Sequence, residues 1–147
     1  MKKKNHILLG IAIVLLLCSI LYFKPLSFSN FANEDNRIAV VVRELGVRNG
    51  EAYNDSNVYQ ESTAKQKRAI LDILENFDYR RTIGTLFSNA YISDPGDKLL
   101  DFYVYNENNL LINTVMISSS GKLIINDKSY TMKNAGQLIE QVIDIME

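Results

Sequence analysis

The fold class is decided by residues 99–132, LLDFYVYNENNLLINTVMISSSGKLIINDKSYTM. Apolar, β-prone runs at residues 99–105, 110–117 and 122–125 alternate there with short turn sequences, and a further run follows Asp127. Consecutive strands joined by short turns are antiparallel neighbours, because a parallel pair needs a long crossover connection. This stretch therefore predicts an antiparallel meander.

Side-chain alternation predicts which face of the first of these strands meets the core. One set of alternate residues is apolar and the other carries a carboxylate and two phenols: Leu100, Phe102 and Val104 against Asp101, Tyr103 and Tyr105. Successive side chains of a strand point to opposite faces. We therefore expect the apolar set on the core and the second set on the outer face. The next strand is apolar on both faces, which leaves open whether residues 46–62 cover the outer face.

Two hairpins are indicated by dipeptides that suit tight turns. Asn126-Asp127 fits a two-residue turn, which places Leu123 opposite Tyr130. Asn49-Gly50 carries the same signal after the β-branched run 38–42, whose strand can continue to Val47. Residues 53–61 show no clear period and are expected to be loop.

Two amphipathic helices are predicted, one before the meander in the sequence and one after it. Thr63 and Gln66 have the spacing of a capping box. The apolar stripe that follows, at helical spacing, consists of Ile70, Ile73, Leu74 and Phe77, and Asn76 can end the helix. Asn134 is expected to cap the second helix, whose stripe is Leu138, Val142 and Ile145.

The predicted order of elements is strand, helix, four or five strands, helix. Residues 79–87 supply one of these strands, with a bulge at Gly84, and Asp94-Pro95-Gly96-Asp97 forms a turn. The expected fold is α+β. It has an N-terminal transmembrane helix, then a mainly antiparallel sheet of about five strands with two helices on one face.

The first 24 residues predict a membrane segment. Residues 7–23, ILLGIAIVLLLCSILYF, carry no charge. As a helix they would span roughly 26 Å, against a hydrocarbon core of about 30 Å. Three lysines precede this run, so the positive-inside rule places the N-terminus in the cytoplasm. We therefore expect a cytoplasmic flank (1–6), a single-pass anchor with the lipid bilayer as its partner (7–23), a tether (24–37) and an extracytoplasmic domain (38–147).

Two other fates of the N-terminal segment stay open. A signal peptide could be cleaved near Ser29, since Ser27 and Ser29 occupy the small positions of a cleavage site and the domain would then be secreted. Cys18 stands where a lipoprotein cysteine would, although Leu17 precedes it and the apolar run continues beyond it.

Composition excludes several classes of protein. The 147 residues fit one ordinary domain, with 16 Lys and Arg against 17 Asp and Glu. Four lysines lie within residues 1–24, where there is no acid, so the remainder is acidic and a nucleic-acid partner is not expected. The single histidine, His6, and the single cysteine, Cys18, exclude His/Cys metal sites and Cys-His or Ser-His catalysis in the main domain.

No catalytic, cofactor-binding or metal-binding residue can be named from the sequence. The acidic turn with Asp94, Asp97 and Asp101 lacks the spacing of an EF-hand, and no pair of carboxylates has a diagnostic spacing. Tyr103, Tyr105 and Asp101 are the candidate partner-binding residues, because tyrosine offers apolar area with a polar tip.

The chain resembles small exported or membrane-anchored proteins of Gram-positive bacteria that belong to an uncharacterised domain family. The resemblance rests on KKK before the apolar run, the helix TAKQKRAILDILENF, the Asp-Pro turn and GKLIINDKSY before a short helix. It implies a bacterial cell-surface setting and supplies no catalytic residue.

The expected function is that of a membrane-anchored extracytoplasmic binding or accessory domain, without enzymatic activity. Its partner would be a cell-surface protein or an envelope ligand. Two alternatives remain: an extracytoplasmic hydrolase that acts through carboxylates, and an immunity-type protein that binds a toxin.

Overall fold

The computed structural model describes residues 2–29, 31–32, 35–49, 51–59, 63–87, 92 and 96–147, and the side chains at 2–6 and 48 lie outside this description. Within these ranges the helices are α1 (Lys2–Tyr22), α2 (Ala64–Glu75) and α3 (Ala135–Met146), with a 3-10 turn η1 (Ile83–Leu86). The strands are β1 (Leu26–Ser27), β2 (Arg37–Arg48), β3 (Glu51–Tyr59), β4 (Asp78–Arg81), β5 (Lys98–Tyr105), β6 (Leu111–Ser118), β7 (Lys122–Ile125) and β8 (Lys128–Met132).

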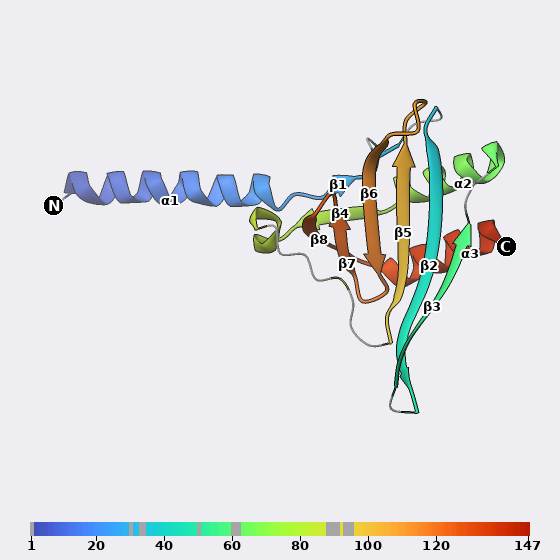
Figure 1. Ribbon diagram of the computed structural model, residues 1–147. Helices are drawn as coiled ribbons and strands as arrows, with labels where there is room; N and C mark the ends of the chain where they lie inside the picture. The colour runs from blue at the N-terminus through green and yellow to red at the C-terminus, as the bar shows by residue number, and fades with distance from the viewer. Residues whose placement is uncertain are drawn as a thin grey trace.

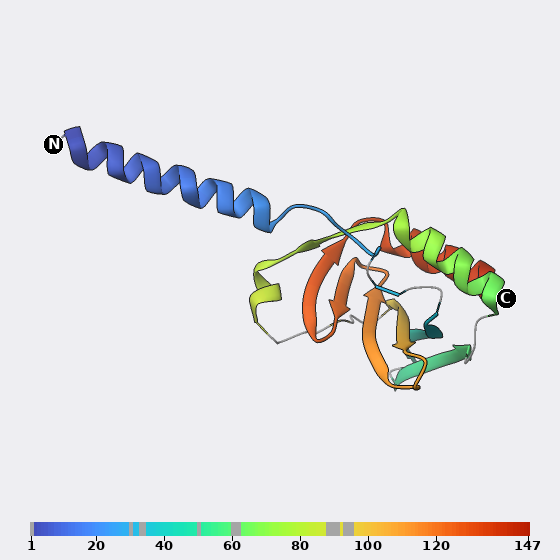
Figure 2. The same cartoon turned by 90° about the horizontal axis from the view of Figure 1, so that it is seen from above.

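The described strands form one antiparallel sheet of eight, in the order β1-β4-β8-β7-β6-β5-β2-β3. The α+β class and the meander from β5 to β8 agree with the sequence, but the expected sheet of about five strands is wrong. The additional strands lie at the two edges, where short or polar segments carry no apolar alternation that a sequence pattern could detect. Helices α2 and α3 lie together on one face of the sheet (Figures 1 and 2).

The register of the last hairpin of the meander, β7–β8, is the one that its turn predicts. Leu123 pairs with Tyr130 across the β7–β8 hairpin, and the turn residues Asn126 and Asp127 both have positive φ angles. In a two-residue turn of this kind both central residues adopt left-handed conformations, which these residue types tolerate. The turn chemistry therefore fixed the pairing of these two strands.

The core lies between the sheet and the two helices. Leu100, Phe102 and Val104 of β5 are each fully buried there, as the alternation predicts. From α2, Ile70 and Leu74 pack into the same cluster, and Ile73 and Phe77 at the sides of the predicted stripe are partly buried against it. From α3 the buried apolar residues are Ala135, Leu138, Ile139, Val142 and Met146.

The two helix N-termini differ in how they are capped. At α2 the predicted capping box is present: Gln66 N–H donates to Thr63 Oγ1 (3.2 Å) and Thr63 N–H donates to Gln66 Oε1 (2.9 Å). Asn134 precedes α3, as expected, but it has a φ of 57° and its side chain makes no capping hydrogen bond. The predicted side-chain cap of α3 by Asn134 is therefore wrong, because this left-handed backbone differs from the extended one that a side-chain cap requires.

Residues 53–61 were expected to be loop, and those up to Tyr59 belong to strand β3, which pairs with β2 over its whole length. The hairpin turns at Asn49, next to the predicted Asn49-Gly50 signal, although Gly50 is outside the described residues. Most of the β3 side chains are exposed, so the strand has no apolar alternation that could identify it.

Residues 79–87 do not form one strand. Strand β4 ends at Arg81, and η1 follows it. Thr82 N–H donates to Thr85 Oγ1 (2.8 Å), and the Thr85 hydroxyl donates to the carbonyl of Ser129 on β8. These local side-chain bonds compete with a ladder of backbone bonds, so the expected strand with a bulge at Gly84 is replaced by a turn.

The N-terminal helix α1 extends away from the sheet (Figure 1), and its large apolar side chains from Ile7 to Leu21 are exposed. Over the described part of the chain, no helix is long and apolar enough to cross a bilayer, so the predicted transmembrane helix at residues 7–23 is wrong. Helix α1 ends at Tyr22, so Phe23 lies outside it and the uncharged part of the helix is limited to residues 7–22. That part is roughly 24 Å long, shorter than a hydrocarbon core of about 30 Å.

Within residues 24–37, which the sequence predicts to be a tether, the described residues include strand β1 and two phenylalanines of the core. β1 pairs with β4, and Phe28 and Phe31 are buried in the core. The Phe28 ring lies 4.7 Å from that of Tyr79, and the Phe31 ring lies 5.9 Å from that of Phe102. Phe28 and Phe31, which are isolated among polar residues in the sequence, therefore hold this segment on the sheet.

Candidate functional site

The three candidate residues of the outer face differ in exposure. Asp101, Tyr103 and Tyr105 do point away from the buried set Leu100, Phe102 and Val104, but Asp101 is only 1% exposed. Its Oδ2 lies 2.6 Å from Arg43 Nη2 of the adjacent strand β2. Asp101 is therefore occupied in a buried ion pair and does not present its carboxylate to a partner.

The two tyrosines are partly buried rather than fully presented. Burial, followed by the nearby Asp101 carboxylate, raises the pKa of Tyr103. The Arg37 guanidinium lies 4.8 Å from the centre of the Tyr105 ring, within the range of a cation–π contact. The Tyr105 ring is thus engaged by Arg37 of the adjacent strand β2, and a role of the two tyrosines in binding a partner stays a prediction.

Lowering the pH is expected to protonate Asp101 and so to reduce the free-energy cost of burying its carboxylate. Burial raises the pKa of this carboxyl above its ordinary value, and the Arg43 guanidinium opposes the rise. A carboxyl with a raised folded pKa contributes stability that is fully present below its unfolded pKa, about 3.9. That contribution is lost as the pH rises through the folded pKa.

The measurement compares the wild type with Asp101→Asn, which is neutral at every pH. Urea unfolding of both at a series of pH values should show the wild type losing stability relative to the variant as the pH rises above about 3.9. A stability difference that stays constant, or that moves in favour of the wild type with rising pH, would contradict the assignment.

The strongest unassigned feature is the free edge of the sheet at β3. Within the described residues β3 pairs with β2 alone, over nine residues from Glu51 to Tyr59 with no register shift. The opposite edge is formed by β1, which has only two residues. Short strands and bulges are devices that protect sheet edges from further pairing. The β1 edge has such a short strand, whereas the described β3 edge is long and has no bulge.

The hydrogen bonds of β2 show which backbone groups of β3 face outward. Leu45 N–H donates to the carbonyl of Asp97, and Gly96 N–H donates to that of Leu45, so the odd-numbered residues of β2 bond toward β5. The even-numbered ones therefore bond toward β3, where they face odd-numbered partners. The backbone groups of Ala52, Asn54, Ser56 and Val58 consequently point away from β2.

A groove of about 350 Å³ lies beside this edge, on the face of the sheet that carries the helices. Its walls are the inward-facing residues of β2, β3 and β5 and the C-terminal half of α3. They are Val42, Glu44, Asp55, Asn57, Tyr59, Lys98, Glu140, Ile143, Asp144 and Glu147. Five carboxylates thus face a single lysine.

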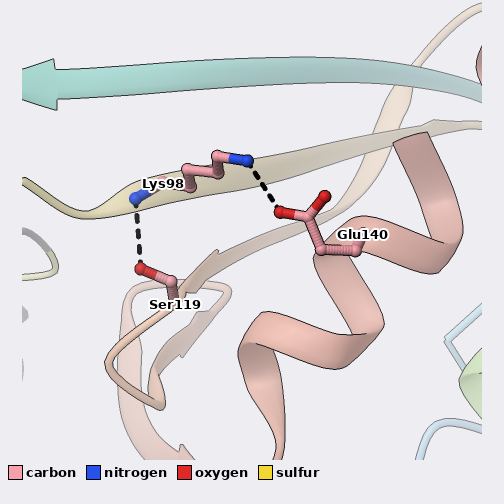
Figure 3. Close-up of polar contacts among 3 residues, drawn as sticks. All are labelled: Lys98, Ser119 and Glu140. Carbon is pink, nitrogen blue, oxygen red and sulfur yellow. Dashed lines mark hydrogen bonds and ion pairs between the residues drawn. The ribbon is translucent and has the colours of Figure 1, made fainter. Parts of the chain in front are cut away.

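That lysine is held by a carboxylate of α3 (Figure 3). Lys98 Nζ lies 2.7 Å from Glu140 Oε1, while the Lys98 N–H donates to Ser119 Oγ (3.1 Å). The hydrogen bond to Glu140 is the main cause that raises the pKa of Lys98, with the charge of Glu44 adding to it. The lysine therefore neutralises one acid of the groove and leaves an excess of negative charge.

An aromatic ring of the β2–β3 hairpin lies next to Glu44, one of the residues that line the groove. Tyr53 Oη donates to Glu44 Oε1 (3.2 Å) across the hairpin. A Cβ atom at Gly46 would lie 2.4 Å from the Tyr53 ring, so only glycine allows the ring to lie over β2 at this point. The pair fixes both Tyr53 and Glu44 on the inward face of the hairpin.

Two other features carry less chemical information. A cleft of about 740 Å³ lies where α2 leads into β4 and β8 into α3, but its lining mixes Arg80 and Lys133 with Asp78 and so favours no one sign of ligand. Asp97 of the predicted acidic turn accepts hydrogen bonds from the hydroxyls of Ser118 and Ser120, and Asp94 lies outside the described residues.

Metal binding gains no support from the part of the chain that the structure describes, where no group of three or more His, Cys, Asp and Glu side chains is placed to hold an ion. Sequence reasoning missed the groove because its acids come from the strands β2 and β3 and from the C-terminal part of the chain around α3, which are far apart in the sequence. The available signal was the lack of any basic residue from Glu51 to Tyr59.

No family model, curated protein or solved structure matches this chain. The function is therefore argued from the geometry of the β3 edge and its groove.

Proposed function

We propose that this domain is a protein-binding module that accepts an extended segment of a partner along strand β3. The observation that carries the proposal is the free edge itself, nine residues long and without a bulge. Extended peptides bind such edges by continuing the sheet, with main-chain hydrogen bonds supplying affinity and side-chain pockets supplying specificity. Here the outward-facing groups of Ala52, Asn54, Ser56 and Val58 would supply the main-chain bonds.

A second copy of this chain suits the β3 edge poorly. Strand β3 contains Glu51 and Asp55 and no basic residue. An antiparallel pair of β3 strands centred on Asp55 would place the two Asp55 carboxylates opposite each other, which is destabilising. The charge of the strand therefore favours a partner of different composition over self-association.

The experiment uses hydrogen exchange, because it reports individual backbone amides. The full chain is mixed with a panel of blocked nine-residue peptides in which Thr and Val alternate with Lys, Gln or Glu. At least one peptide is expected to slow the exchange of the amides of Ala52, Asn54, Ser56 and Val58. The intervening amides already bond to β2 and should change little.

A proline substitution supplies the matched control. Ser56→Pro removes an N–H that faces outward, so the β2–β3 ladder is kept while the added strand loses a donor. Ser56→Val keeps the N–H and should bind as the wild type does. Protection of other amides only, or binding that is the same in Ser56→Pro, would contradict strand addition.

A further inference from the structure

We infer that the segment bound along β3 carries lysine or arginine at alternate positions, with these side chains directed into the acidic groove between β3 and α3. This inference rests on the proposed function and adds to it the chemical class of the partner. It makes the groove, rather than the strand edge alone, the source of specificity.

The periodicity of the sheet defines which side chains of a bound strand reach the groove. The odd-numbered residues Asp55, Asn57 and Tyr59 of β3 face the groove, together with Val42 and Glu44 of β2. An added strand continues the same pleat at about 4.8 Å from β3. Every second side chain of the bound segment would therefore point to the same face as Asp55.

The charge of the groove then selects the residue type. Asp55, Asp144 and Glu147 are exposed carboxylates on its two walls, whereas its lysine is already bound to Glu140. The C-terminal end of α3 lies on the same wall, and the helix dipole there also favours a cation. Negative potential from both walls would attract basic side chains and repel acidic ones.

The apolar lining supports long basic side chains rather than small ones. Val42, Tyr59 and Ile143 are partly buried among the carboxylates. Lysine and arginine can lay their methylene stems on such a surface while the charged end reaches the acids. The groove thus offers both contacts that an alternating basic segment needs.

The test measures the affinity of the full chain for three dye-labelled peptides by fluorescence anisotropy. The first alternates Lys with Thr and Val. The second has Gln in place of each Lys. The third contains the same lysines in one block, which keeps the net charge but removes the alternation. Each is measured with the wild type and with Ser56→Pro.

The alternating lysine peptide is expected to bind about tenfold more tightly than either of the others, a difference of about 1.4 kcal/mol. Its preference should disappear in the triple variant Asp55→Asn, Asp144→Asn, Glu147→Gln. A control variant, Glu75→Gln, Glu107→Gln, Asp127→Asn, removes as many exposed carboxylates elsewhere and should keep the preference.

The remaining outcomes separate the two proposals. Equal binding of the lysine and glutamine peptides, lost in Ser56→Pro, would overturn the basic partner and leave strand addition standing. Equal binding of the alternating and block lysine peptides, unchanged in Ser56→Pro, would show attraction by net charge alone and overturn both. Failure of all three peptides to bind would overturn both as well.

Discussion

Replacement of Arg43 by Met is expected to lower the free energy of unfolding by about 3–5 kcal/mol, the usual cost of leaving a buried charge without its partner. Asp101 is almost fully buried, and its Oδ1 has no hydrogen-bond partner among the described residues. Without the guanidinium the carboxylate would stay in the interior uncompensated. A loss of this size is a large share of the total stability of a domain, roughly 5–15 kcal/mol. Urea unfolding at pH 7 measures it.

Two further variants separate the charge effect from the loss of side-chain packing. Arg80→Met removes an exposed arginine from another strand and should change stability little. The double variant Arg43→Met, Asp101→Leu removes both charges and should recover most of the loss, because an apolar pair has no desolvation cost. A double variant as unstable as the single one would show that the ion pair is not the source of the effect.

The second large effect is expected for Phe102→Ala, which should cost about 3–5 kcal/mol. Phe102 is fully buried at the centre of the sheet, between Val40 of β2 and Val115 of β6. Its ring also contacts that of Phe31, at 5.9 Å between centroids. Truncation would leave a cavity that rigid neighbouring strands cannot fill. Denaturant unfolding of wild type and variant gives the difference.

An exposed phenylalanine provides the matched control. Phe87 is 63% exposed, so Phe87→Ala should have a much smaller effect. If Phe31 and Phe102 stabilise each other, the double variant Phe31→Ala, Phe102→Ala should lose less than the sum of the single losses. Additive losses would mean that Phe31 and Phe102 are not coupled energetically.

The sequence was informative where structure depends on local contacts. The β7–β8 register followed from the turn residues Asn126 and Asp127, and the start of α2 followed from Thr63 and Gln66. Each depends on residues only a few positions apart. Alternation likewise predicted which side chains of β5 form the core.

The sequence did not predict which side chains of the outer sheet face are buried, nor which segments form the edge strands. Alternation placed Asp101 on the outer face but could not show that it is buried there against Arg43. Strand β3 is exposed on both faces, so no period marks it. The acidic groove depends on Asp55 of β3 and Asp144 of α3 meeting across the fold, which no local pattern encodes.

The position of α1 relative to β3 has a mechanical consequence. The end of α1 contacts the domain near the β1 edge, where Tyr22 Oη donates to the carbonyl of Thr82 (3.4 Å) and the Arg81 guanidinium lies over the Tyr22 ring. The free strand β3 is at the other edge of the eight-stranded sheet. Eight strands have seven spacings of about 4.8 Å, so the two edges are roughly 34 Å apart along the sheet. A segment bound on β3, as proposed above, would therefore be separated from the N-terminal helix by the full width of the sheet.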